Sequence, residues 1–271
     1  MNPPTPSRPP AVAGTFYPAD PAALAREVEA CLAAAPRRAA PMPKALIVPH
    51  AGYLYSGTTA ARAYALLAPA RQIVRRVVLL GPAHRVPIRG LALPVAEAFA
   101  TPLGTVAIDA EANAAAMKLP QVSASDVAHN LEHSLEVQLP FLQTVLDDFT
   151  LLPFAVGAAS PAEVAEVIEL LWGGPETLIL ISSDLSHFHA YKQAQALDHA
   201  TAETILALDP TLRHEQACGA TPINGLLLAA RRRNLAVEQL GLCNSGDTAG
   251  DRNRVVGYGA FALMEPKRAA N

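Results

Sequence analysis

Short, uninterrupted apolar runs alternate with segments of helical periodicity along most of this chain. Runs without polar residues at alternate positions are typical of strands that helices cover on both faces. The predicted strands are 44–48, 77–80, 91–94, 105–108, 150–156, 178–182, 237–242 and 255–262. The predicted helices are 21–35, 56–67, 111–118, 135–146, 161–171, 194–208 and 222–232. This order predicts an α/β fold, in which a single three-layer α/β/α domain surrounds a mostly parallel central sheet.

Several helix ends carry local signals. Asp20 can cap the first predicted helix, and Pro21 suits its first turn. Ser56 is placed to cap the second predicted helix. Pro140 lies inside the predicted helix 135–146, where we expect it to kink or break the helix.

The composition is that of an ordered chain with a large core. Of the 271 residues, 51% are hydrophobic and 17% are charged, which excludes an intrinsically disordered protein. We expect one domain over 1–271. Because five prolines fall within the first ten residues, we expect 1–20 to form an extended N-terminal arm.

Charge, hydropathy and cysteine content exclude further classes of protein. The net charge of −3 and the short, scattered arginine clusters predict no nucleic-acid partner. No apolar run reaches the roughly 18 to 20 residues of a membrane span, and we see no signal peptide. We therefore expect a soluble, cytoplasmic protein without a membrane partner. The three cysteines form no CxxC pair, which excludes a disulfide framework and a four-thiolate zinc site.

Polar residues follow the predicted strands at the point where each strand ends. His50 follows 44–48, His84 follows 77–80, and Asp184 and His187 follow 178–182. The carboxyl ends of parallel strands meet at one edge of an open sheet, where ligands bind. Two histidines at that edge could share one ion, since imidazole suits Zn, Cu, Fe and Ni. Cys218 precedes a predicted helix, a position that favours its thiolate, and it could be a soft metal ligand or a nucleophile.

Two tyrosines follow His50 in the same loop. Tyr53 and Tyr55 would stand beside the ion and could hydrogen-bond a substrate, or they could be aromatic residues that pack the loop. The chain has neither GxGxxG nor GxxxxGK[ST], so nucleotide binding has no support.

Two further segments carry chemical groups without matching a protease or hydrolase motif. The segment Glu132-His133-Ser134-Leu135-Glu136 is not HExxH, and His133 could be an acid, a base or a substrate contact. The two glutamates could cap or flank a helix. The polar run 182–189 lacks a GxSxG elbow, so His187 is more plausible as a general base oriented by a nearby carboxylate than as part of a Ser-His-Asp triad.

Taken together, these motifs resemble the Memo-like family, whose bacterial and archaeal members are called AmmeMemoRadiSam system protein B. The resemblance covers nearly the whole chain. It rests on the segments 8–18, 48–57, 81–84, 132–140, 182–187 and 218–219. The family is similar in fold to the class III extradiol dioxygenases, which bind non-haem iron in a crevice of one α/β domain.

The resemblance also implies roles for individual residues. The metal ligands would be His50, His84 and Cys218. His187 matches the segment that carries the catalytic base. His133 matches a second active-site histidine, and Asp184 would line the same pocket. The dioxygenases use two histidines and a carboxylate, whereas the third ligand here would be an oxidisable thiolate, so ring cleavage does not carry over.

The leading hypothesis is a dioxygenase-like oxidoreductase that uses Fe(II) or Cu, rather than Zn, on a small molecule or peptide in the crevice. The resemblance also implies association with radical SAM and AMMECR-type proteins. A second hypothesis is a non-enzymatic module that binds a peptide or protein through Tyr53, Tyr55 and Trp172. A third hypothesis is a hydrolase in which the ion at the same site is zinc and activates a water molecule.

Overall fold

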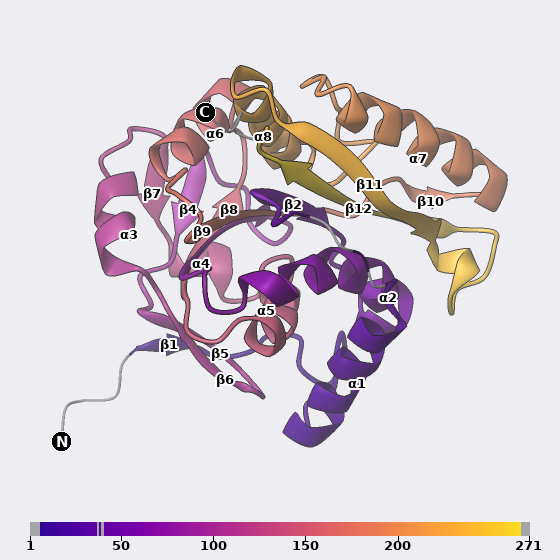
Figure 1. Ribbon diagram of the computed structural model, residues 1–271, viewed down its shortest axis with the longest axis horizontal. Helices are drawn as coiled ribbons and strands as arrows, with labels where there is room; N and C mark the ends of the chain where they lie inside the picture. Colours follow the sequence, from indigo (N-terminus) through magenta and orange to yellow (C-terminus); the bar gives the residue numbers. More distant parts are fainter. Residues whose placement is uncertain (1–5, 37, 39–40, 267–271) are drawn as a thin grey trace.

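A nine-stranded sheet occupies the centre of the protein, with helices on both faces (Figure 1). The computed structural model describes residues 6–36, 38 and 41–266. The strands of this sheet are β2 (Ala45–Val48), β3 (Arg76–Pro82), β4 (Leu91–Leu93), β7 (Val122–Ala124), β8 (Thr150–Val156), β9 (Thr177–Ser182), β10 (His187–His189), β11 (Ala236–Asn244) and β12 (Val255–Met264). Their order is β10-β12-β2-β9-β3-β8-β4-β7, and β11 pairs with β12.

The middle of the sheet is parallel. β2 pairs with β9, β9 with β3, and β3 with β8, all in parallel. Antiparallel pairing joins β12 to β2, β10 and β11 at one end and β4 to β8 at the other. The parallel strands end at one edge, so the loops that follow β2, β3, β8 and β9 lie together there.

Helices cover the two faces with separate apolar cores. Leu46 and Val48 of β2 contribute to one core, whereas Ala45 and Ile47 contribute to the other, because successive strand side chains point to opposite faces. The first core packs beneath α1 (Pro21–Ala34), α2 (Tyr53–Tyr64), η1 (Ala65–Ala70) and α5 (Leu139–Val145). The second packs beneath α3 (Ala110–Ala116), α6 (Pro161–Leu170), α7 (Tyr191–Leu206) and α8 (Ala220–Arg232). The predicted three-layer α/β/α fold is thereby confirmed.

Two predicted helix starts are wrong in detail. α2 begins at Tyr53, after Gly52, and the Ser56 hydroxyl donates to the Ala51 carbonyl instead of capping the helix. Pro140 does not kink a long helix. It lies in the first turn of α5, where its missing N–H costs no hydrogen bond, and a short 3-10 turn, η2 (Glu136–Gln138), precedes it.

The N-terminal segment differs from the extended arm that we expected over 1–20. Residues 1–5 lie outside the described residues. Strand β1 (Ser7–Arg8) pairs with β5 (Ala98–Thr101) in a small sheet that β6 (Gly104–Ala107) completes. The chain then forms a turn, in which the Gly14 amide donates to the Tyr17 carbonyl.

None of the helices in the described part of the chain is long and apolar enough to cross a membrane. The remaining elements are α4 (Asp126–His129) and η3 (Ser245–Asp247).

Candidate metal centre

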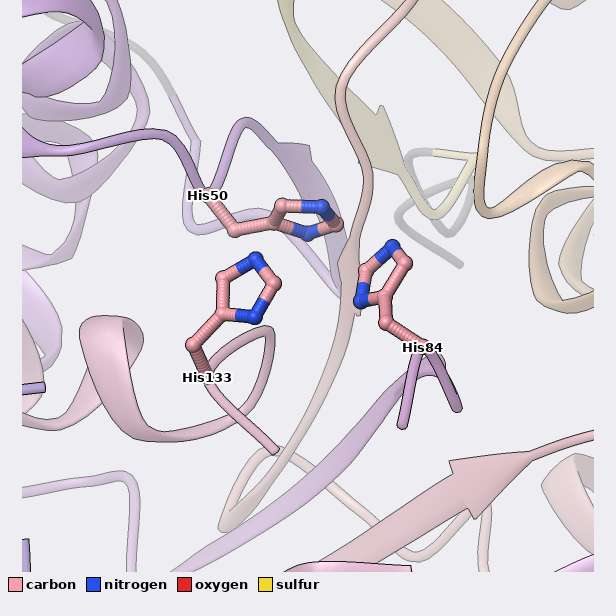
Figure 2. A group of neighbouring side chains, drawn as sticks. All are labelled: His50, His84 and His133. Atoms are coloured by element: carbon pink, nitrogen blue, oxygen red, sulfur yellow. The ribbon is translucent and has the colours of Figure 1, made fainter. Parts of the chain in front are cut away.

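Three histidine rings surround one space at the carboxyl edge of the sheet (Figure 2). His50 follows β2, His84 follows β3, and His133 precedes η2. Each offers one ring nitrogen, and these three atoms all lie within 4.8 Å of one another. The strand ends therefore bring His50 and His84 together as the sequence predicted, and His133 joins them as a third possible ligand.

Neighbouring hydrogen bonds determine the tautomer of His50. Its Nδ1 lies 2.9 Å from the Ser182 hydroxyl oxygen. That hydroxyl donates its proton to the Ser134 carbonyl and accepts a hydrogen bond from the Gln138 amide nitrogen. The Gln138 oxygen in turn accepts from Tyr64, which identifies the nitrogen as the donor. Ser182 can then only accept from His50, so Nδ1 carries the proton and Nε2 keeps a free lone pair.

A buried carboxylate orients His84 in the same way. The Nδ1 of His84 lies 2.9 Å from Oε1 of Glu132, and the His84 backbone amide donates to Oε2. The Ser134 amide also donates to this carboxylate, at 2.9 Å. Burial alone would raise the pKa of Glu132, but these hydrogen bonds outweigh it and lower the pKa to about 2. A carboxylate that holds one ring nitrogen and leaves the other free is a common support for metal-binding histidines.

His133 and His50 are neutral at pH 7. Burial lowers the pKa of His133 to about 4 and the pKa of His50 well below its ordinary value. The Nδ1 atom of His133 is buried and has no hydrogen-bond partner among the described residues. Its nearest carboxylate oxygen is Oε1 of Glu132, at 3.4 Å. Neutral imidazoles with an unused lone pair are suitable metal ligands.

The thiol of Cys218 lies beside one ring of this group. Its Sγ lies 3.2 Å from Nε2 of His50. The next residue, Gly219, approaches Ser183 so closely that its amide donates to the Ser183 hydroxyl at 2.9 Å, and a side chain at Gly219 would lie only 2.6 Å from the Ser183 Cβ. We expected the start of α8 to favour the thiolate. Burial outweighs that effect and raises the pKa of Cys218 to about 12, so the free thiol is protonated.

Asp184 is buried beside His50. Its Oδ1 accepts hydrogen bonds from the backbone amides of His50 and Ala51, at 2.7 and 3.3 Å. Burial raises the pKa of Asp184 to about 7 despite these two hydrogen bonds. The group therefore changes protonation state near neutral pH.

His187 lies on β10, which the sequence patterns did not predict. Burial lowers the pKa of His187. The loop before it is held by Asp198 of α7, whose Oδ1 accepts from the Ser186 amide at 3.0 Å. The next residue, Phe188, has a φ of 63°, which is rare for an aromatic residue. Rare backbone conformations of this kind often mark functional segments.

The two tyrosines after His50 lie in different places. Tyr53 is buried, and its hydroxyl donates to the Val137 carbonyl at 2.7 Å. It therefore packs in the core and does not stand beside the ion site. Tyr55 is partly exposed and lines a cavity next to His133. Trp172 is buried at the opposite edge of the sheet, against Lys44 and Arg233.

Two cavities adjoin the histidine group, and His187 lines both of them. The larger cavity, of about 820 Å³, includes His84 and Cys218 in its lining. The smaller cavity, of about 550 Å³, includes His133 and Asp184. Residues of the centre therefore line both cavities.

A buried ion pair that the sequence patterns did not reveal supports the segment carrying Glu132 and His133. Arg8 pairs with Glu136 at 2.7 Å, and its guanidinium also donates to the carbonyls of His129 and Glu132. We had considered Glu132 and Glu136 as residues that cap or flank a helix. Each is instead a buried anion with several donors, and the one available signal was the presence of charges within an apolar segment.

This geometry fits a metal ion. His50 and His84 each have Nδ1 in a hydrogen bond and Nε2 free. The Nδ1 of His133 is buried and has no hydrogen-bond partner among the described residues. Imidazole and thiolate together suit Zn, Cu and Fe. The buried negative charge of Glu132 would offset part of the positive charge of the ion.

Comparison with known proteins gives a consistent result. The family model described as "Memo-like protein" matches residues 8–262. A MEMO1 family protein of Methanosarcina barkeri is 37% identical, over 94% of this chain and 99% of its own length. A MEMO1 family protein of Aquifex aeolicus is 36% identical, over 93% and 97%. The structure of an uncharacterized protein from Escherichia coli K12 is similar in fold, with a TM-score of 0.52, 15% identity, and coverage of 80% of this chain and 99% of that one.

Proposed function

Since this chain belongs to the Memo-like protein family, we propose that it is a metal-dependent oxidoreductase that uses iron or copper to act on a small molecule. One observation carries the proposal. The donor atoms of His50, His84 and His133 lie within 4.8 Å of one another, and the thiol of Cys218 lies against the free nitrogen of His50.

The proposed ligands are His50, His84 and Cys218. His50 and His84 each have a partner that holds Nδ1 and leaves Nε2 free. A thiolate ligand favours copper and iron over harder cations. His133 would face the smaller cavity, from which an oxygen molecule can approach the centre.

When bound, such an ion would supply one-electron redox chemistry. The protein would supply orientation and proton transfer. Neutral His187 lies between the two cavities, so its imidazole can accept a proton from a molecule in either one. Asp184, with a pKa of about 7, can hold or release a proton beside His50 near neutral pH.

The test measures how fast the metal-loaded protein consumes oxygen. The metal is first added to the protein under oxygen-free conditions. Separate samples receive Fe(II), Cu(I) or Zn(II), and an oxygen electrode follows uptake after ascorbate is added. We expect uptake from the iron or copper sample and none from the zinc sample. His187→Ala should retain the metal and take up oxygen more slowly, whereas His199→Ala, an exposed histidine on α7, should match the unaltered protein. Retention of zinc alone would contradict the proposal.

A zinc hydrolase is the second candidate, and the three-histidine group is the observation that favours it. Three histidines with an open fourth position are a known catalytic zinc arrangement, in which the ion lowers the pKa of a bound water to about 7. Turnover of an ester or amide by the zinc-loaded protein, without oxygen uptake, would favour this candidate.

A further inference from the structure

The larger cavity beside the histidine group has one apolar wall. The loop after β3 contributes Val86, Pro87 and Ile88, and the segment after β8 contributes Ala158 and Ala159. Both segments leave the carboxyl edge of the sheet, and the first of them follows β3, the strand that also positions His84.

Backbone pairing makes this wall rigid. The Ala158 amide donates to the Ile88 carbonyl at 2.9 Å, and the Gly90 amide donates to the Ala158 carbonyl at 2.9 Å. The Gly157 amide donates to the Gly90 carbonyl at 3.0 Å. A side chain at Gly157 would lie 2.1 Å from the Ile88 carbonyl oxygen, so the absence of a side chain there is what permits this close approach.

The lining also has a polar part. It includes His187 and His189 of β10 and the segment that contains His214 and Cys218. His214 donates from Nδ1 toward the Cys218 carbonyl and accepts from the Thr221 hydroxyl, both at 3.3 Å, so its ring is held in place. The lining thus combines an apolar surface with imidazoles, and it includes His84 and Cys218 of the centre.

The described lining of the larger cavity holds no lysine or arginine that would pair with a polyanion. Among the described residues that line it, Glu215 is a carboxylate, and none is a lysine or arginine. By contrast, Arg254 lines the smaller cavity. The volume of about 820 Å³ falls within the range of pockets that enclose a small organic molecule.

We propose that the larger cavity is the substrate chamber of the centre and that it takes an uncharged organic molecule with an apolar body. This assignment rests on the proposed function, because the chamber opens onto the same ligands. Ala158 and Ala159 contribute two small side chains to its lining. Nucleotides, sugar phosphates and other polyanions are excluded as substrates.

The first experiment measures binding of the uncharged naphthalene dye prodan by fluorescence, on full-length protein with and without Fe(II). We expect saturable binding, and we expect an anionic anilinonaphthalene sulfonate to bind more weakly. Ala158→Phe should narrow the chamber and weaken prodan binding at least about tenfold. The matched control is Ala249→Phe, which places the same group at an exposed alanine of the smaller cavity and should leave prodan binding unchanged.

Unchanged binding in Ala158→Phe, a loss in Ala249→Phe, or tighter binding of the sulfonate would each overturn the assignment. The measurement without metal keeps the two proposals separate. Prodan binding that depends on Ala158 in a protein that retains no metal would support the chamber and contradict the proposed function alone.

A second experiment tests whether the chamber opens onto the ion. Protein loaded with Co(II) is titrated with imidazole and with 4-phenylimidazole, and the visible absorption of the cobalt reports binding. We expect the phenyl derivative to bind about tenfold more tightly, and Ala158→Phe to remove that advantage. Equal affinities for the two probes in the unaltered protein would contradict the proposal.

Discussion

Single side chains around the candidate metal centre set the protonation state of each possible ligand. Ser182 holds the proton on Nδ1 of His50, and Glu132 does the same for His84. Burial keeps His50 and His133 neutral, so these imidazoles need not lose a proton to bind a metal at pH 7. Cys218 differs, because its thiol has a pKa of about 12 and must lose its proton to become a ligand.

This difference predicts how metal affinity depends on pH. If Cys218 is a ligand, each bound ion displaces the thiol proton, and the affinity should rise about tenfold per unit between pH 6 and 8. Cys218→Ala should remove the part of the pH dependence that comes from the thiol proton. The difference in pH dependence between the unaltered protein and Cys218→Ala separates the thiol from any contribution of Asp184. Calorimetric titration in buffers of different ionisation enthalpy would count the protons released. Equal proton release by both proteins would assign the third ligand to His133 instead.

Glu132 is predicted to support metal binding without touching the ion. In Glu132→Gln, the neutral amide would orient His84 less firmly and would no longer offset the charge of the ion. Metal affinity should fall about 10- to 100-fold. Glu169→Gln, at an exposed ion pair with Arg232, is the matched control and should leave the affinity unchanged. An unaltered affinity in Glu132→Gln would show that this carboxylate has no part in the site.

At the scale of elements, the parallel strands explain which parts of the centre the sequence could predict. His50 and His84 directly follow strongly apolar strands, and such strand ends meet at one edge of a sheet. The segment around His133 has no regular period, since it consists of α4, a turn and η2. Its position depends on Arg8, which is far away in sequence, and local patterns carry no information about that contact.

The same reasoning applies to the tyrosines and to Cys218. Sequence alone could place Tyr53 in the loop after His50, but it could not show that α2 begins at Tyr53 and turns this side chain into the core. Nor could the position of Cys218 before α8 reveal that the thiol is half-buried against His50.

Arg8 is predicted to be important for stability because it forms a buried ion pair. Arg8→Ala would leave Glu136 charged and buried, and the free energy of unfolding should fall by about 3–5 kcal/mol. Arg232→Ala breaks an exposed ion pair with Glu169 and should change the free energy of unfolding by less than about 1 kcal/mol. Denaturant unfolding of both variants measures the two effects. Similar values for the two would contradict the role assigned to Arg8.

At the scale of the whole molecule, the centre exists only when β2, β3 and the N-terminal segment are assembled. A metal that binds the folded chain alone should therefore stabilise it, by about 2.7 kcal/mol at a free concentration one hundred times the dissociation constant. For a chain of this size, the melting temperature should rise by about 5–10 °C. Differential scanning calorimetry with metal and then with a chelator measures the rise and its reversal. A melting temperature that does not respond would mean that the folded chain does not bind the ion preferentially.

The central claim is that His50, His84 and Cys218 hold an iron or copper ion. Its most direct test is the metal content of protein reconstituted without oxygen, measured by mass spectrometry for the unaltered chain and for His50→Ala, Cys218→Ala and His199→Ala. We predict about one ion per chain for the unaltered protein and for His199→Ala, and a loss of the ion in the other two variants. Equal metal content in all four proteins, or no metal in any of them, would contradict the account.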